Sequence, residues 1–353
     1  MLCAVNVHGK PPARRRKPAA VTMKDVAREA GVSYQTVSRA INGYPEISPE
    51  TRKKVLHITR RIGYRPNRLA GSLRTSQSNV IGLIVSDVEN VFFAEVASGV
   101  EAEATRNGYS ILLANSGEDI VRERQAVTSL FERRVDGLIL APAEGDHGYL
   151  RSALPSEFPI VAINRKIELA RCGAVLTENE KGARGAVEYL ISRGHKKIGA
   201  IVASAGLMTS RERLRGFQAA MTAAGLPVRR EWLATGSVRP EGARAAAVKI
   251  LSMRDRPTAF LTSSHRISEG LFLALKDRGL RHGPDVEIVG FDNVCWAALV
   301  DPPMPVVEQP TRDIGRRAAR MLVDMITGAG GPSIVRLPTR LITHVEGKLQ
   351  ISA

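Results

Sequence analysis

Residues 34–42 place several hydrogen-bonding side chains on one face of a predicted helix. Ser33 is a natural N-cap for a helix that runs to Ile41, in which Val37 and Ile41 face inward. This helix leaves a polar set on its outer face: Tyr34, Gln35, Ser38, Arg39 and Asn42. In the major groove an Arg side chain can donate two hydrogen bonds to guanine, and a Gln side chain can pair with a base edge. We therefore predict that Tyr34, Gln35 and Arg39 read DNA sequence.

Two further helices must hold this segment in place. Thr22 and Asp25 have the spacing of a capping box, and apolar residues follow at helical spacing until Gly31 ends the first helix. Ser48 and Pro49 begin the third helix, whose inward positions are Val55, Ile58, Thr59 and Ile62. This pattern is typical of a helix-turn-helix domain over residues 22–66. The alternative is an ordinary small helical bundle with a polar outer face.

The positive charge of the chain is concentrated at this end. Residues 1–78 contain 16 Lys and Arg against 4 Asp and Glu, a net charge of +12 out of +16 for the whole chain. Local basicity favours a polyanion as the partner, because each neutralised phosphate releases counterions. Residues 1–21 contain too little apolar material to fold, so we expect a disordered basic arm. Two interpretations of this arm remain open: extra phosphate contacts, or an idle extension from an upstream start codon.

Length and composition indicate a globular protein with a large core beside the small helical domain. The chain has 353 residues, of which 44% are hydrophobic and 5% aromatic. No apolar stretch approaches the roughly 20 residues of a membrane span, and the N-terminus lacks the pattern of a secretory signal. Cys3, Cys172 and Cys295 are far apart, which fits a reducing compartment without disulfides or a metal site. We expect a cytoplasmic protein without membrane contact.

From residue 79 onward, short β-branched runs alternate with longer helical stretches. The expected strands of the first series are 80–85, 110–113, 137–140, 160–163 and 174–176, with helices at 93–106 and 122–133. In the second series the strands are 198–202, 232–235, 259–262 and 287–290, and the helices are 181–193, 211–224, 241–253 and 269–278. This alternation predicts parallel sheets with helices on both faces.

These motifs resemble, in order, those of the lactose-repressor (LacI/GalR) family of transcription regulators. The N-terminal matches are TMKDVAREAGVSYQTVSRAING, ETRKKV and GYRPNRLAGSLR, and the later ones are IGLIVSD, RRVDGLILAP, GHKKIGAI, RERLRGFQAAM and VGFDN. The resemblance implies a repressor that binds a palindromic operator in double-stranded DNA as a homodimer, under the control of a small-molecule effector. It implies DNA contacts at Thr22, Ser33, Tyr34, Gln35, Thr36, Ser38, Arg39, Asn42, Asn67, Arg68 and Leu73.

The resemblance also implies the fold and the domain order. An N-terminal all-α helix-turn-helix domain is followed by a hinge helix or linker at 67–78 and by an α/β core at 79–353. The core has two similar lobes with parallel sheets, like periplasmic binding proteins, and serves effector binding and dimerisation. Lobe 1 comprises about 79–179 and 309–328, and lobe 2 about 180–308 and 329–353. The chain should therefore cross between lobes near 178–180, near 309 and around 328–333.

The hinge segment is too short to be a stable helix by itself. In the family, two such segments fold against each other in the minor groove, and a Leu from each enters the central base step. Leu73 has that position here. The alternative is a plain linker.

Polar and aromatic side chains follow the predicted strands, where ligands bind in such folds. By resemblance they contact the effector: Asp87, Asn90, Phe92, Phe93, Asn164, Arg165, Thr209, Arg213, Ser264, His265 and Asp292. Each also has a local alternative, such as an ion pair for Arg213 or a turn for Asp292.

The chain departs from the family at Ser264-His265, where an Asp that holds sugar hydroxyls is common. His265, with Arg165, Lys166 and Arg213 near the same cleft, would suit a carboxylate or phosphate. The expected effector is therefore a sugar, a sugar acid or a related metabolite, and an anionic group on it would fit these side chains.

Two other classes of function fit the sequence less well. An enzyme is disfavoured because GxGxxG, Walker A, HExxH and GxSxG motifs are missing, and no His residues have metal-ligand spacing. A nonspecific architectural DNA protein would explain the basic end but not a two-lobed core. We expect no catalysis, no cofactor and no metal. The sequence shows no terminal heptads of the kind that form a tetramerising coiled coil, so we expect a dimer and not a tetramer.

Overall fold

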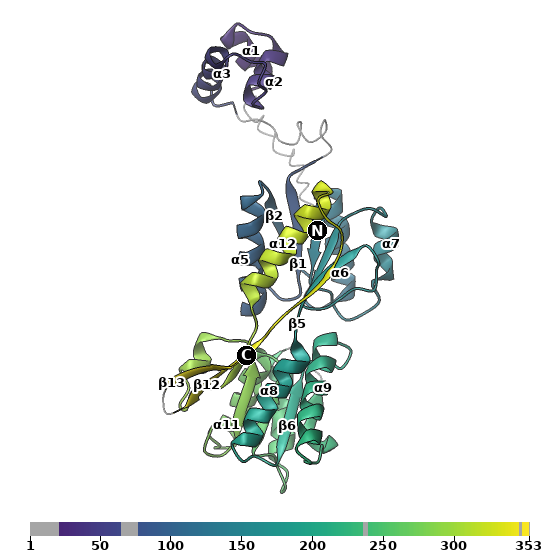
Figure 1. Ribbon diagram of the computed structural model, residues 1–353, viewed down its shortest axis with the longest axis vertical. Helices are drawn as coiled ribbons and strands as arrows, with labels where there is room; N and C mark the ends of the chain where they lie inside the picture. The colour runs from purple at the N-terminus through teal and green to yellow at the C-terminus, as the bar shows by residue number, and fades with distance from the viewer. Residues whose placement is uncertain (1–20, 65–76, 236–238, 346–347, 353) are drawn as a thin grey trace, which may run out of the picture. The chain divides into compact units, whose positions relative to one another are not determined.

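The chain divides into two compact units, residues 1–76 and 77–353. The computed structural model describes residues 21–64, 77–235, 239–345 and 348–352 (Figure 1). The predicted hinge contacts Asn67, Arg68 and Leu73 and the basic arm lie outside the described residues. None of the described helices is long and apolar enough to cross a membrane.

The first unit contains three short helices, α1 (Met23–Ala30), α2 (Tyr34–Ile41) and α3 (Pro49–Arg61). The predicted caps are confirmed. Thr22 and Asp25 form the capping box of α1, and the hydroxyls of Ser33 and Ser48 cap α2 and α3. Gly31 ends α1 with a φ of 65°, a left-handed conformation that glycine adopts without a Cβ clash. The helices share one core: Val26, Ala30, Val37, Ala40, Val55, Ile58 and Tyr64.

Six parallel strands form the sheet of lobe 1. They are β1 (Val80–Val85), β2 (Ser110–Asn115), β3 (Gly137–Leu140), β4 (Ile160–Ile163), β5 (Cys172–Thr177) and β11 (Ile334–Leu337). Their order is β11-β5-β4-β3-β1-β2. Helices α5 (Val91–Arg106) and α12 (Thr311–Thr327) pack on one face, and α6 (Ile120–Glu132) and α7 (Leu150–Ala153) on the other (Figure 1).

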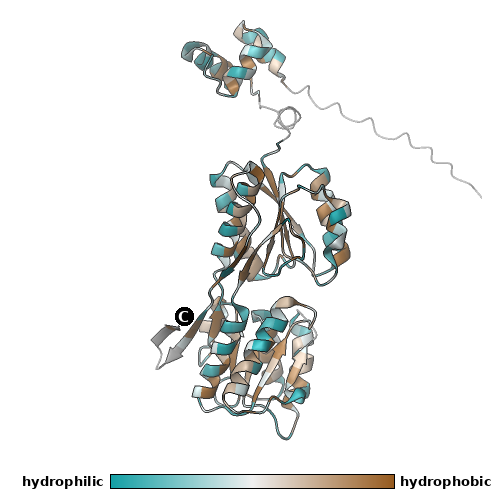
Figure 2. Ribbon diagram, turned by 45° about the vertical axis from the view of Figure 1, so that its right-hand side comes forward, coloured by the Kyte–Doolittle hydropathy of each residue, from teal (hydrophilic) through white to brown (hydrophobic). Residues whose placement is uncertain are grey.

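Seven strands form the sheet of lobe 2. They are β6 (Ile198–Val202), β7 (Leu233–Thr235), β8 (Ala259–Thr262), β9 (Glu287–Phe291), β10 (Val306–Glu308), β12 (Arg340–Val345) and β13 (Lys348–Ser352), in the order β13-β12-β10-β9-β8-β6-β7. Helices α8 (Asn179–Ser192) and α9 (Met208–Ala223) cover one face, and α10 (Pro240–Leu251) and α11 (His265–Asp277) the other. Figure 2 shows hydrophobic strands between helices with hydrophilic outer faces.

The last crossing between the lobes differs from its predicted position. β11 pairs with β5 in the first sheet, so the chain crosses for the last time after Leu337 and not around 328–333. Gly328 only ends α12, and the chain enters β11 before it leaves lobe 1. The second sheet is also not purely parallel, because β12 and β13 run antiparallel to their neighbours. Antiparallel strands need only a short connection, so β12 and β13 can follow one another without a helix between them.

Glycines set the separation between α5 and α12. A Cβ on Gly99 would lie 2.2 Å from the Arg312 carbonyl oxygen, and a Cβ on Gly315 would lie 2.1 Å from the Val96 carbonyl oxygen. Each helix thus presents a glycine to the backbone of the other. The contact fixes the position of α5, whose first turn carries Phe92 and Phe93.

Candidate DNA-reading helix and effector cleft

The outer face of α2 presents the predicted base-reading side chains. Tyr34 is 52% exposed, and Gln35 and Arg39 are exposed as well. The Ser33 hydroxyl accepts the Thr36 N–H at 3.1 Å, so the first turn, which carries two of the readers, is held by its own cap. The helix can therefore offer one aromatic, one amide and one guanidinium group to a groove.

The prediction that Ser38 points outward is wrong. Ser38 is buried, because it lies beside Val37 on the face that packs against the rest of the unit. The side-chain amide of Asn42 donates to the Ser38 carbonyl oxygen at 2.8 Å. Asn42 itself is exposed, so it covers the end of α2 while remaining at the surface.

The ends of the strands in both lobes converge on one cavity of about 70 Å3. Ten of the predicted effector contacts line it: Asp87, Asn90, Phe92, Phe93, Asn164, Arg165, Thr209, Arg213, Ser264 and Asp292. Four polar lining residues were not predicted from the sequence: Glu118, Ser210, Ser263 and Gln309. His265 is not among the lining residues.

The aromatic wall of the cavity comes from the start of α5. The Asn90 side-chain oxygen accepts the Phe92 N–H at 2.9 Å and so caps the helix. The rings of Phe92 and Phe93 meet edge to face with their centroids 5.0 Å apart. This cap holds both rings beside the cavity and leaves the Asn90 amide group for a ligand.

Three polar lining residues have left-handed backbones. The φ angles of Glu118, Asn164 and Asp292 are 60°, 65° and 76°. Such conformations are costly for residues other than glycine and concentrate at functional sites. Each of the three follows a strand end, where the turn directs its side chain to the cavity.

Arg165 is neutralised inside the cavity by Glu118. The two terminal nitrogens of Arg165 donate to the two Glu118 oxygens at 2.6 and 2.7 Å. This bidentate pair occupies the fork with which an arginine would bind a carboxylate or phosphate. In contrast, Arg165 Nε and the Asn164 side-chain oxygen are buried without a hydrogen-bond partner. One donor and one acceptor in this part of the site are thus unused.

Arg213, in α9 of lobe 2, also lines the cavity. Its Nε donates to the Asn179 side-chain oxygen at 2.8 Å, and a terminal nitrogen donates to the Ser263 carbonyl. The guanidinium lies 3.8 Å from the centre of the Phe291 ring. Burial lowers the pKa of Arg213 to about 10, although the Asp292 and Glu212 carboxylates oppose this shift. Arg213 therefore stays charged at neutral pH.

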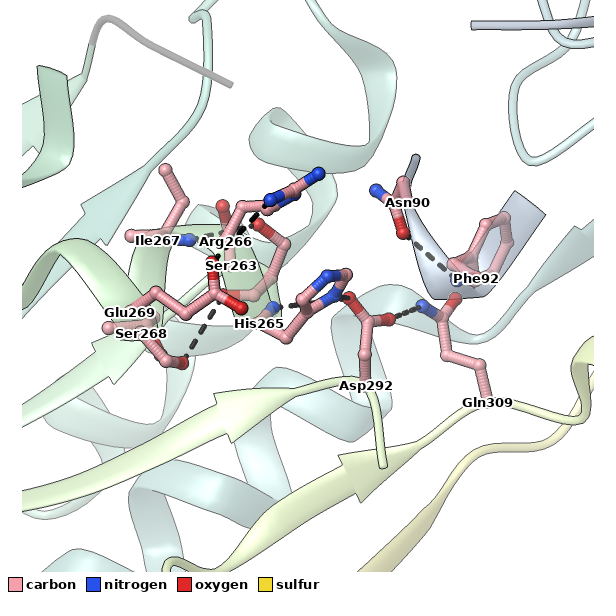
Figure 3. A network of polar contacts seen from close by, with 12 residues as sticks. Asn90, Phe92, Ser263, His265, Arg266, Ile267, Ser268, Glu269, Asp292 and Gln309 are labelled. Carbon is pink, nitrogen blue, oxygen red and sulfur yellow. Dashed lines mark hydrogen bonds and ion pairs between the residues drawn. The ribbon is translucent and has the colours of Figure 1, made fainter. Parts of the chain in front are cut away.

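Asp292 lies between His265 and Gln309 (Figure 3). Gln309 donates to one carboxylate oxygen at 2.7 Å, and the other oxygen is 3.2 Å from both His265 N and His265 Nδ1. Burial alone would raise the pKa of Asp292, but the hydrogen bond and charge of His265, together with Arg213, lower it overall. Asp292 is therefore ionised at neutral pH.

The geometry of His265 gives no support to the predicted effector contact. Ser264 caps α11, and His265 is the first residue of that helix. Its side chain is 3% exposed and turns to Asp292 instead of the cavity. Lys166 also lies outside the cavity and pairs with Glu168 at 2.6 Å. Of the side chains expected to attract an anion, His265 and Lys166 are thus absent from the cavity lining, Arg165 is paired with a carboxylate, and Arg213 donates to an amide oxygen and a backbone carbonyl.

The lining combines acidic, basic and aromatic side chains. The carboxylates of Asp87, Glu118 and Asp292 balance the guanidinium groups of Arg165 and Arg213. Carboxylate oxygens accept hydrogen bonds from hydroxyls, arginines donate to them, and the aromatic rings can cover an apolar face. Among the described residues no group of three or more His, Cys, Asp or Glu could hold a metal ion.

Comparison with known protein families identifies the class. A model of the periplasmic binding proteins and sugar binding domain of the LacI family matches residues 78–345. A model of bacterial regulatory proteins of the lacI family matches residues 22–67. The chain belongs to the lacI family of bacterial regulatory proteins, with a helix-turn-helix region and a sugar-binding type of core.

Individual relatives cover nearly the whole chain. Catabolite control protein A of Priestia megaterium is 35% identical over 323 residues, 91% of this chain and 97% of that protein. A crystal structure of a candidate ribose operon repressor from Burkholderia thailandensis is 67% identical, with a TM-score of 0.73, and covers 76% of this chain and 100% of that one. The Lac repressor dimer bound to operator and the anti-inducer ONPF is 26% identical, with a TM-score of 0.83, and covers 92% of this chain and 98% of that one. The chain is thus a transcriptional regulator of the repressor type.

Proposed function

We propose that the chain represses transcription by binding a palindromic operator as a homodimer, and that a small uncharged polyol in the cavity between the lobes controls it. One observation carries the choice of effector: both terminal nitrogens of Arg165 are paired with the Glu118 carboxylate, so this arginine is already neutralised inside the cavity. A neutral ligand with several hydroxyls can use such donors and acceptors without adding charge. The 67% identical relative is a candidate ribose operon repressor, so a pentose is the first ligand to test.

Operator reading is assigned to the exposed face of α2. Tyr34, Gln35 and Arg39 supply the base contacts, while Thr22, Ser33, Thr36 and Asn42 are proposed to support them or to contact phosphates. One helix-turn-helix offers little surface, whereas a two-fold dimer places two of them on a palindrome. The buried Ser38 is not proposed as a direct contact.

The hinge is proposed to link the two functions. Asn67, Arg68 and Leu73 would fold into the minor groove only when both copies are held at the right separation. Where the chain leaves the hinge, the Asp136 carboxylate accepts the N–H groups of Ser78 and Asn79 at 2.8 and 2.7 Å. Asp136 stands directly before β3, so a movement of the lobe 1 sheet would be passed to the start of the hinge. An effector would shift this equilibrium by its different affinity for the two arrangements of the lobes.

Catalysis forms no part of this proposal. The polar groups of the cavity hold one another in fixed pairs, an arrangement that suits recognition of a ligand. A protein that acts on chromosomal operators belongs in the bacterial cytoplasm, and we propose that location.

The test begins with operator DNA selected from a random-sequence library by the full chain. Fluorescence anisotropy of that DNA is measured with D-ribose and with ribose 5-phosphate, which differ by one anionic group. The proposal expects a palindromic consensus and a change of operator affinity with D-ribose but a weaker effect of the phosphate. A consensus without two-fold symmetry would refute the dimeric operator, and a response to the phosphate alone would refute the uncharged effector.

A further inference from the structure

His265 is a buried polar residue that the cavity itself does not use. It begins α11, and its backbone N–H and its Nδ1 both lie 3.2 Å from the same oxygen of Asp292. The side chains of His265 and Asp292 are 3% and 8% exposed, so water does not screen this contact as it would at the surface. The histidine therefore holds the carboxylate through a contact that is shielded from solvent.

Asp292 is held on its other oxygen as well. Gln309 donates to that oxygen at 2.7 Å, and the Gln309 side-chain oxygen accepts from the Thr177 hydroxyl at 3.0 Å. Gln309 and Thr177 are buried and belong to the segments that cross between the lobes. The Asp292 carboxylate is thus hydrogen-bonded on one side to the first turn of α11 and on the other to a segment that crosses between the lobes (Figure 3).

The backbone conformation of Asp292 also restricts the direction of its side chain. Asp292 follows β9 with a φ of 76°, so its side chain leaves the chain in a direction that the turn dictates. A carboxylate has about four acceptor positions, and the backbone N–H, the imidazole and the Gln309 amide together use three. Acceptor capacity remains for the cavity that Asp292 lines.

We propose that His265 is a positioning residue, which fixes the Asp292 carboxylate so that its free acceptor position faces the effector. This inference rests on the proposed function, because it assumes that Asp292 binds the ligand. The imidazole acts through its Nδ1 hydrogen bond and not through its bulk. Ser264, not His265, is the side chain of this turn that lines the cavity.

Two substitutions separate the hydrogen bond from the bulk. In His265→Asn the side-chain amide nitrogen can stand close to the place of Nδ1, so a donor to Asp292 remains. In His265→Leu the side-chain volume is similar, but the side chain has no donor for Asp292. Because a hydrogen bond to a charged group contributes about 1.5–3 kcal/mol, the Leu variant should bind D-ribose roughly tenfold to a hundredfold more weakly in calorimetry. The Asn variant should stay within about threefold of the original chain, since its hydrogen bond is retained.

Crystal structures of both ligand-free variants give a readout that does not depend on the effector. The Asp292 carboxylate should leave its observed position in His265→Leu and keep it in His265→Asn. If the Leu variant does not fold, His265→Ala, which also lacks the donor, takes its place in the comparison.

The outcomes separate the inference from the proposed function. An unmoved Asp292 in the donor-free variant overturns the positioning role, as does a displaced Asp292 in the Asn variant. If Asp292 moves but D-ribose binding does not change, His265 positions Asp292 as inferred and the effector role of Asp292 is wrong. If the original chain does not bind D-ribose, the pentose assignment fails while the crystal structures still decide the inference.

Discussion

A pair of Gly→Ala substitutions should change stability in opposite directions. At Gly315 in α12 the new Cβ would stand 2.1 Å from the Val96 carbonyl oxygen and 2.7 Å from the Val100 nitrogen. Ordinary contacts begin at 3.4 Å, so α12 and α5 must separate by more than 1 Å. Both obstacles are backbone atoms of a regular helix, which cannot rotate away. Overpacking of this kind costs about 1–3 kcal/mol, and rigid neighbours place this site in the upper half of that range.

Gly185 in α8 provides the matched control. A Cβ there meets nothing within 4 Å, so alanine should contribute only its better helix propensity, about 0.5–1 kcal/mol of stabilisation. For a core of this size, 1 kcal/mol corresponds to about 2 °C in Tm. Calorimetry of the full chain at one fixed concentration should therefore give a Tm about 4 °C lower for Gly315→Ala and about 1–2 °C higher for Gly185→Ala. A Gly315→Ala chain as stable as the original, or a common direction for both variants, would refute the packing argument.

Four further results are expected. Arg39→Ala should weaken operator binding by about 1–3 kcal/mol and leave nonspecific DNA binding nearly unchanged in anisotropy titrations; equal loss on all DNA would contradict base reading. Leu73→Ala should reduce operator affinity and DNA bending in gel-shift assays while D-ribose binding by calorimetry stays the same, and unchanged bending would indicate a plain linker. The Glu212 carboxylate, which is 7% exposed, pairs with Arg336 of the other lobe at 2.9 Å. Glu212→Gln and Arg336→Met should therefore each lower the stability of the core in urea denaturation, and the two losses should not add in the double variant. Additive losses would disprove the coupling. The pKa of Asp292 is lowered in the folded chain, so its ionised form stabilises the fold above the unfolded-state pKa of about 3.9, and this stabilisation is lost as the pH falls through the folded-state pKa. On acidification below about pH 4, Asp292→Asn should therefore lose less stability than the original chain. Parallel curves of stability against pH for the two chains would contradict this expectation.

The regular elements of the fold were readable because burial leaves a simple pattern. The bounds predicted for β3, β4, β6 and β8 agree with the structure, since each is a short buried run that pairs on both sides. The helix α12 was not predicted, although Ile314, Ala318 and Leu322 lie on its buried face at helical spacing. Residues 309–328 were assigned to lobe 1 as a returning segment, but no helix or strand was predicted beyond residue 290.

The positions of the cavity residues were predictable from one rule, that side chains at the ends of parallel strands meet. The same rule also covers Glu118, which follows β2 in the loop before α6. The predicted strand ended at 113, whereas β2 continues to Asn115. Gln309 was predicted only as a point where the chain crosses between the lobes. A single amide side chain there has no sequence pattern that would indicate a contact with the cavity. The orientation of side chains was harder to predict. Ser38 was placed on the correct helix but on its exposed side, and His265, which was expected to follow a strand, is the first residue of α11.

The charge preference of the cavity shows why residue types alone do not fix the ligand. Counting Arg165, Lys166, Arg213 and His265 predicts an anion, whereas in the structure each of these groups already has a partner. Arg165 illustrates the reason: an arginine attracts a phosphate only when its fork is free, and Glu118 occupies both terminal nitrogens. A bound anion would have to break that pair and leave the largely buried Glu118 carboxylate without its partner, which opposes the gain. A hydroxyl group adds no charge and does not require that this ion pair be broken, and this favours the uncharged polyol.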